Sequence, residues 1–255
     1  MAVTPSGKDK ILPLTRVYIG GYDLSGDARE ISSIDATHAE ADMTGFSNEI
    51  FNYQPGRMTA GMRGFKALMN DDTAGAWTQL KTPGNTARQL SICFGGGGVP
   101  AAGDPAYHLP AVQMSNPVNL DGNAWVVGAD FVPDAQQMTS NFRTPWGYVL
   151  RGAVSMSATL TASSSNSIDL GAAMANGWTA IIHILATSSG NFALTIKHST
   201  DDSSFATLGT FTTTGGAVGS ELLSGATTVN RYVAFNAVRT AGTVTAVVTF
   251  VPNTH

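Results

Sequence analysis

Residues 178–199 read WTAIIHILATSSGNFALTIKHS, two apolar runs on either side of the tripeptide SSG at 188–190. In the second run, Phe192, Leu194 and Ile196 alternate with smaller or polar residues, which is the period of a half-buried β-strand. Turn-forming residues between two such runs predict a β-hairpin over 178–199.

The same pattern continues to the end of the chain. Short, evenly spaced strands with glycine-containing gaps are typical of a β-sandwich. From Gly152 onward only seven residues are charged, a change of composition that predicts a domain boundary near 150–160. We therefore expect an N-terminal domain over 1–150, a linker near 145–152 and a C-terminal β-sandwich domain over 155–255. Further strands of this sandwich are predicted at 205–212, 230–238 and 243–251.

The N-terminal domain is predicted to be α+β, within a protein that is mainly β. One short helix is expected at 74–81, with N-cap candidates at Asp71-Asp72-Thr73 and a stop at Pro83-Gly84. The stretches 39–56 and 95–100 have no steady period and are predicted as long loops, which in a domain are often functional. Strands bounded by Gly, Pro or Asn are predicted at Leu12–Leu24, Glu30–His38, Arg57–Lys66, Ala87–Phe94, Tyr107–Met114 and Asn123–Val132.

Composition narrows the class of protein. Only 13% of the 255 residues are charged, whereas 43% are apolar, which favours a β-rich globular protein over a disordered one. The apolar runs are too short for a membrane helix, and the N-terminus lacks the apolar core of a secretory signal. A single cysteine, Cys93, excludes an internal disulfide. The net charge of −4 argues against general attraction to nucleic acid phosphates.

The acidic residues are concentrated near the N-terminus. Residues 21–50 carry a local net charge of −6, with Arg29 as the single base, whereas the charged residues of 51–100 are five basic and two acidic side chains. A solvated acidic face is the simplest interpretation of such a cluster. The acidic residues are Asp23, Asp27, Glu30, Asp35, Glu40, Asp42 and Glu49.

No motif carries catalytic chemistry. The Gly95–Gly98 run is followed by Val-Pro and lacks the Lys-Ser/Thr pair of a phosphate-binding loop. His183 lies inside an apolar run, where a satisfied strand histidine is far commoner than a catalytic base. His198 near Asp201-Asp202 suggests an Asx-rich turn before it suggests a metal site. Cys93 is expected to be an inert core thiol. We expect no enzyme activity, no cofactor and no metal.

Several short motifs together point to a family. Residues 17–27 read VYIGGYDLSGD, residues 40–46 read EADMTGF, and Pro55-Gly56 leads on to Asp71-Asp72. In the C-terminal half, residues 194–205 read LTIKHSTDDSSF, followed later by Arg231-Tyr232. These motifs resemble the tail tube (major tail) proteins of long, non-contractile-tailed bacteriophages, including the β-sandwich that many such proteins append. Residues 95–150 match nothing in that pattern.

The resemblance implies a tail-tube-type β-sandwich or barrel in the N-terminal domain. It also implies a virion protein, assembled in the host cytoplasm, that forms hexameric rings stacked into a tube, with inner strands that close a continuous β-barrel. Its partners would be copies of itself, the tape-measure protein and the terminator and tip proteins, and DNA would pass without specific binding. An acidic lumen would repel phosphates, whereas a basic one would hold them. The residues assigned to the lumen are Asp23, Asp27, Glu30, Asp35, Glu40 and Asp42, and those assigned to an inter-subunit loop are Met43, Phe46, Ile50, Phe51 and Tyr53.

Two alternatives stay open from the sequence. One is another virion structural protein, such as a head decoration protein. The other is a glycan-contacting β-sandwich module that uses Trp178 and Tyr232, which requires both rings to be exposed. Under the tail tube interpretation, the C-terminal domain from about Ser155 is expected to be dispensable for assembly.

Overall fold

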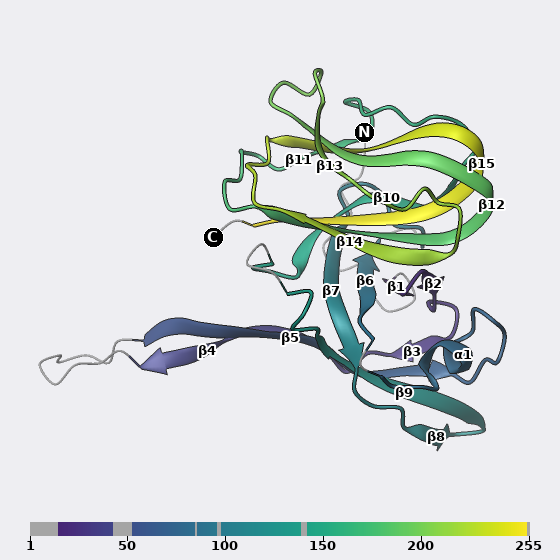
Figure 1. The fold of residues 1–255 in the computed structure, drawn as a ribbon. Helices are drawn as coiled ribbons and strands as arrows, with labels where there is room; N and C mark the ends of the chain where they lie inside the picture. Colours follow the sequence, from purple (N-terminus) through teal and green to yellow (C-terminus); the bar gives the residue numbers. More distant parts are fainter. Residues whose placement is uncertain (1–14, 43–52, 85, 96–97, 139–141, 254–255) are drawn as a thin grey trace, which may run out of the picture.

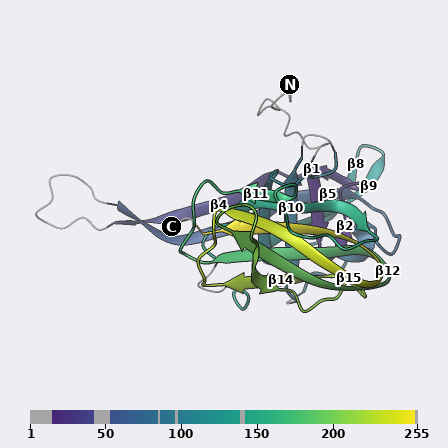
Figure 2. The same cartoon turned by 90° about the horizontal axis from the view of Figure 1, so that it is seen from above.

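The computed structural model describes residues 15–42, 53–84, 86–95, 98–138 and 142–253. The protein is mainly β, with one short helix in this part of the chain, which confirms the predicted class. Figures 1 and 2 show a β-rich body from which strands β4 and β5 project as a two-stranded arm. The elements are β1 Thr15–Ile19, β2 Tyr22–Asp23, β3 Ala28–Glu30, β4 Ser33–Asp42, β5 Tyr53–Leu68, α1 Ala76–Leu80, β6 Arg88–Phe94, β7 Pro105–Gln113, β8 Val118–Asp121, β9 Ala124–Pro133, β10 Trp146–Met156, β11 Ser167–Asp169, β12 Trp178–Ser199, β13 Ala206–Thr210, β14 Gly219–Gly225 and β15 Tyr232–Pro252.

All fifteen described strands belong to one antiparallel sheet, which does not close into a barrel within the described residues. Its main path runs β13-β12-β15-β10-β7-β6-β1-β2. Strand β10 pairs with β7 and with β15, so backbone pairing continues from one half of the chain to the other. The predicted linker near 145–152 is therefore wrong. A fall in the number of charged residues reflects how exposed a segment is to solvent, and strand pairing can continue across it. The division into domains 1–150 and 155–255 stays a prediction.

Strand β12 is continuous over 178–199, so the predicted hairpin with its turn at 188–190 is wrong. Strand β15 likewise continues through Ala241-Gly242. The two strands pair with each other along their length, with register shifts between Ser188 and Phe192, and Figure 1 shows them curving together. Gly242 has a φ of +64°, and a Cβ there would collide with the carbonyl oxygens of Ser188 and Ser189. The turn-forming residues bend this ribbon instead of reversing it.

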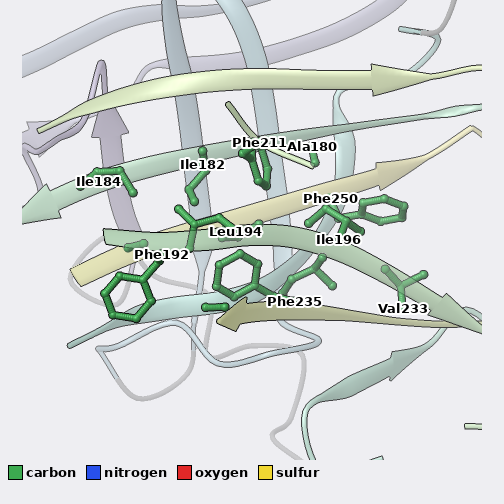
Figure 3. Packing of buried hydrophobic residues seen from close by; sticks show 14 of the residues in the cluster. Ala180, Ile182, Ile184, Phe192, Leu194, Ile196, Phe211, Val233, Phe235 and Phe250 are labelled. Carbon is green, nitrogen blue, oxygen red and sulfur yellow. The ribbon is translucent and has the colours of Figure 1, made fainter. Parts of the chain in front are cut away.

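The bend converts the ribbon into a sandwich. The first half of β12 pairs with β14 and with the second half of β15, and the second half of β12 pairs with β13 and with the first half of β15. The two layers enclose one buried cluster to which Ile182, Ile184, Leu194 and Phe235 belong (Figure 3). The predicted C-terminal β-sandwich is thus present, built from two long bent strands and not from a series of short hairpins.

A second buried cluster lies in the N-terminal half, where α1 packs Ala76 and Leu80 against side chains of β5, β6, β7 and β9. The strands predicted at 87–94, 107–114 and 123–132 are confirmed within two residues as β6, β7 and β9. The segment predicted as one strand at 12–24 contains a turn at Gly20-Gly21, whose φ angles of +62° and +95° favour glycine. Strand β8 was not predicted, since its four residues alternate too briefly to be recognised.

Candidate assembly surfaces and a buried junction

The arm is a two-stranded antiparallel ribbon. Strands β4 and β5 pair from Ser33↔Arg63 out to Asp42↔Tyr53, with one register shift between His38 and Glu40. The loop predicted at 39–56 is wrong for residues 39–42 and 53–56, which are strand. These residues form strands because their backbones pair with each other across the ribbon, and such pairing does not require an alternating pattern of apolar side chains. Of the residues assigned to an inter-subunit loop, Tyr53 begins β5, and Met43, Phe46, Ile50 and Phe51 lie outside the described residues.

The six residues assigned to a lumen do not share one environment. Glu30 forms an ion pair with Lys66 of β5 at 2.8 Å, which lowers the pKa of this carboxyl group through a hydrogen bond and the opposite charge. Asp23 accepts hydrogen bonds from the backbone and hydroxyl of Ser25. Asp35, Glu40 and Asp42 lie on β4, opposite the basic strand β5. The sequence-local charge is therefore partly balanced across strands, and the lumen assignment stays a prediction.

Asp27 has a structural role that the sequence did not indicate. One carboxylate oxygen, Oδ2, accepts the backbone N–H of Ala76 at 2.9 Å, and Oδ1 accepts the side-chain amide of Asn70 at 3.1 Å. The N-cap of α1 is Gly75, which makes no side-chain cap bond. The prediction that Asp71 and Asp72 cap this helix is therefore wrong, because a carboxylate distant in sequence reaches the free N–H group first.

Replacing Asp27 with Ala is expected to lower the free energy of unfolding by about 1–2 kcal/mol, the usual cost of losing a capping carboxylate. Asp71→Ala, which removes an exposed side chain beside the same helix, is the matched control and should change stability by less than about 0.5 kcal/mol. Urea unfolding followed by tryptophan fluorescence measures both. Equal effects of the two substitutions would contradict the assignment.

Exposed apolar side chains gather on one face of the β8–β9 hairpin, which we call the β8–β9 face. Leu120 lies opposite Trp125 and Val118 opposite Val127, so the four share a side of the sheet. Val127 is in the buried cluster, whereas Leu120 is 59% and Trp125 57% exposed. Met69, whose backbone N–H donates to the Trp125 carbonyl oxygen at 2.9 Å, is also exposed. The side of the sheet that carries the buried Val127 thus extends to the edge strand β8, where its apolar side chains are exposed to solvent. Such an exposed apolar patch is typical of a protein interaction surface.

A second exposed apolar site contains aromatic rings. Trp146 and Tyr148 of β10 line a pocket of about 430 Å³ together with Pro105, Leu170 and other residues. Tyr107 packs edge-on against Trp146 at 5.2 Å between centroids and supports its ring. In contrast, Trp178 is buried and stacks on Phe250, so its predicted role as an exposed glycan contact is wrong. The apolar run at 178–186, in which Trp178 is the first residue, was the signal for its burial.

The two halves of the chain meet at a buried junction. On the side of β12 that faces away from the sandwich core, Thr179 and His183 are fully buried, as is Thr249 of β15. They contact Ser91 of β6 and His108 of β7, which are also fully buried. Apolar residues surround this polar group, because Tyr18, Cys93, Ala106, Val149 and Val247 form a separate buried cluster.

The polar side chains of the junction form one continuous chain of hydrogen bonds. The Gly21 backbone N–H donates to His183 Nδ1 at 3.3 Å, so His183 must carry its proton on Nε2, which lies 2.9 Å from Ser91 Oγ. Ser91 Oγ in turn lies 3.2 Å from Thr249 Oγ1, and either hydroxyl can be the donor of this bond. Thr249 Oγ1 lies 3.0 Å from His108 Nδ1, and His108 Nε2 lies 2.8 Å from Thr179 Oγ1. Both imidazoles are neutral in this arrangement, and every ring nitrogen has a partner.

Burial lowers the pKa of both histidines to about 3, and the second imidazole lowers that of His108 further. The expectation that His183 is a satisfied strand histidine is confirmed. Cys93 is buried and burial raises its thiol pKa, as expected for an inert core thiol. Near His198, the Asp201 carboxylate accepts the N–H groups of Ser203 and Ser204, which confirms the Asx-rich turn.

Among the described residues, no group of three or more His, Cys, Asp or Glu side chains is placed to hold a metal ion. No helix in the same part of the chain has the length and apolar character needed to cross a membrane. The described residues present three features typical of contact surfaces: the β4–β5 arm, the exposed apolar β8–β9 face and the pocket lined by Trp146 and Tyr148.

No protein-family model matches the chain, and no curated protein matches it. Among solved structures, the chain is similar to the crystal structure of the SPP1 Dit (gp 19.1) protein, described as a paradigm of the hub adsorption apparatus in Gram-positive infecting phages. The alignment covers 93% of this chain and 99% of the Dit chain, at 9% identity and a TM-score of 0.34.

Proposed function

We propose that this chain is a non-enzymatic structural protein of a bacteriophage tail that assembles with copies of itself. The finer form of the proposal is a tail tube subunit that forms stacked hexameric rings, assembled in the host cytoplasm around a tape-measure protein and joined to terminator and tip proteins. The observation that carries the proposal is the β4–β5 arm, and the motif resemblance supplies the type of assembly.

An isolated two-stranded ribbon is at best marginally stable in water. At its base the arm is supported, since β5 also pairs with β3 and β9 and Gly61 donates its N–H to the Tyr107 hydroxyl at 2.9 Å. From residue 53 to residue 61, β5 pairs with β4 alone among the described strands. A ribbon extended this far from the body is explained if a neighbouring subunit covers it.

The β8–β9 face offers a second contact of the kind that ring formation needs. Its exposed residues are uncharged and include tryptophan, and charged residues are depleted at the centres of protein interfaces. Strand β8 is also an edge strand, paired only with β9 among the described strands. The arm and this face would thus supply two different surfaces, as a head-to-tail ring contact requires.

The arm is tested by removing its end. Glu40 and Pro55 are direct partners in the ribbon, so residues 41–54 can be replaced by an Asn-Gly turn that closes the two strands. We expect a folded protein with a melting temperature near that of the full chain and complete loss of rings and tubes in negative-stain images. We expect the body to retain its cores because the described residues that form the two large buried clusters all lie outside 41–54.

The control is Val238→Ser, which removes an exposed apolar side chain from the sandwich without touching the arm or the β8–β9 face, and which should assemble normally. An arm-shortened protein that still forms rings would overturn the proposed role of the arm. Isolated binding of the full chain to phage heads without rings would favour the head decoration alternative. Retention on a glycan array through Trp146 and Tyr148 would favour the glycan-contacting alternative.

A further inference from the structure

A pocket of about 340 Å³ lies where the loop before β7 meets strand β10 and the segment that follows it. Its wall comes from both halves of the chain, with Pro100 and Ala101 on one side and Leu160 and Ser165 on the other. The pocket is separate from the arm and from the β8–β9 face. Among the described residues that line it, Arg151 is the single charged one.

The guanidinium Nε of Arg151 is a buried cationic donor that has no hydrogen-bond partner among the described residues. Burial alone lowers the pKa of this guanidinium, with no opposing effect from a nearby carboxylate. Removing a cation from water without a counter-charge is unfavourable. Two other described arginines show the usual pairing: Arg231 makes two bonds of 2.7 Å to Asp169, and Arg88 donates to the Gln79 carbonyl oxygen.

The backbone around Arg151 is irregular in a way that sets its position. The pairing of β10 with β15 shifts register between Val149 and Arg151, and again between Arg151 and Val154. Bulges of this type redirect side chains and are frequent beside functional sites. Leu150 on one side of Arg151 is in the sandwich core and Val149 is in the junction cluster, so the strand is anchored while the guanidinium lines the pocket.

We propose that this pocket receives the carboxylate of an acidic side chain carried by a partner protein chain. A guanidinium matches a carboxylate with two parallel hydrogen bonds, and a buried pairing would supply the missing counter-charge. The rim favours a polypeptide over a free ion. Val99 is 53% and Val154 45% exposed there, and the flanking residues of a docked chain would cover these apolar side chains.

The test uses the isolated protein, so its outcome is independent of ring formation and of the phage-tail proposal. The Nε–H resonance of Arg151 is followed by NMR during titration with aspartate capped as N-acetyl-L-aspartate N-methylamide. The matched neutral probe is the capped asparagine. We expect a saturable shift of the Arg151 resonance with capped aspartate and none with capped asparagine. The Arg231 resonance, already paired with Asp169, is the internal control and should stay in place.

Arg151→Met retains side-chain length and removes the charge. We expect it to abolish the shifts of the Val99 and Val154 methyl resonances by capped aspartate and to leave the melting temperature at least as high as in the unmodified chain. A lower melting temperature together with unchanged binding would mean that Arg151 is structural, which overturns the proposal. Absence of any shift at Arg151, or tighter binding of inorganic phosphate than of capped aspartate, would overturn it as well.

Discussion

A chain that ends at Arg151 is expected not to fold. The charge pattern alone made the residues from about Ser155 seem dispensable, but strand β10 pairs with β15 from Tyr148↔Phe250 to Met156↔Val244. Truncation would also leave Ser91 and His108 at the former junction without their partners Thr179, His183 and Thr249. A buried polar group that loses its partner costs about 1–3 kcal/mol, and the exposed apolar face adds to this. The expected loss approaches the whole stability of a domain, about 5–15 kcal/mol.

The experiment compares residues 1–151 with a nicked full-length chain. A protease site inserted between the exposed Ala172 and Ala173 cuts the backbone without removing any strand, and we expect the two pieces to stay associated and to unfold cooperatively. Residues 1–151 alone should be insoluble or lack a cooperative transition. If they form a stable monomer with a sharp melting transition, the junction contributes far less than its contacts imply.

Acid is expected to destabilise the protein from about pH 6.5 downward, at a higher pH than paired carboxylates alone would cause. Unfolded histidine has a pKa near 6.5, whereas the folded pKa values of His108 and His183 are about 3. Between these values the unfolded chain binds more protons than the folded one, so the stability present above pH 6.5 is lost progressively as the pH falls towards 3. Each histidine contributes a slope of up to about 1.4 kcal/mol per pH unit.

The folded protein disfavours protonated histidine because His183 Nδ1 already accepts a hydrogen bond from the Gly21 N–H. Protonating His183 Nδ1 would place its N–H against the Gly21 N–H, two donors facing each other. The described side chains that contact the two imidazoles offer no counter-charge, since Tyr18 is a buried phenol whose pKa burial raises, and the hydrogen-bond partners are hydroxyl groups. His198 acts in the same direction, because partial burial lowers its pKa. Asp169, whose pKa the hydrogen bond from Arg231 lowers to about 2, loses its contribution only below about pH 4, at the acid end of the histidine range.

Urea unfolding at pH 7.5, 6.5, 5.5 and 4.5 measures this slope. His183→Gln and His108→Gln remove one titrating group each, and each should reduce the slope by up to about 1.4 kcal/mol per pH unit, whatever its effect on stability at pH 7.5. His198→Gln, outside the junction and only partly buried, is the comparison variant and should reduce the slope less than either junction substitution. A free energy of unfolding that is constant from pH 7.5 to 4.5 would show that the two imidazoles are not buried as neutral groups.

Local patterns in the sequence carried part of the fold. Strands β6, β7 and β9 are bounded by Gly, Pro or Asn and alternate cleanly, so their limits were predictable to within two residues. The Asx turn at Asp201 and the neutral strand environment of His183 also follow from adjacent residues. The unbroken apolar run at 178–186 indicated burial, because its alternate residues face the sandwich core and the junction.

Contacts between distant residues decided the rest. A glycine-rich stretch such as Ser188–Gly190 is compatible with a reversal or with a bend, and only the pairing of β12 with β15 on both sides of it selects the bend. A carboxylate such as Asp27 has several possible donors within reach, and only folding brings the N–H of Ala76 to it. The sequence of residues 21–50 has a strong excess of acidic residues, but a cation such as Lys66, which pairs with Glu30, comes from another strand.

The sequence by itself therefore determined that the protein is mainly β, where most N-terminal strands lie and that its C-terminal half forms a sandwich, because alternation and turn chemistry act between neighbouring residues. The tertiary structure alone decided that the arm projects, that two histidines close a buried junction and that the Nε of Arg151 has no hydrogen-bond partner among the described residues. These features depend on which strands meet, and strand pairing joins residues whose separation in the chain leaves no local trace.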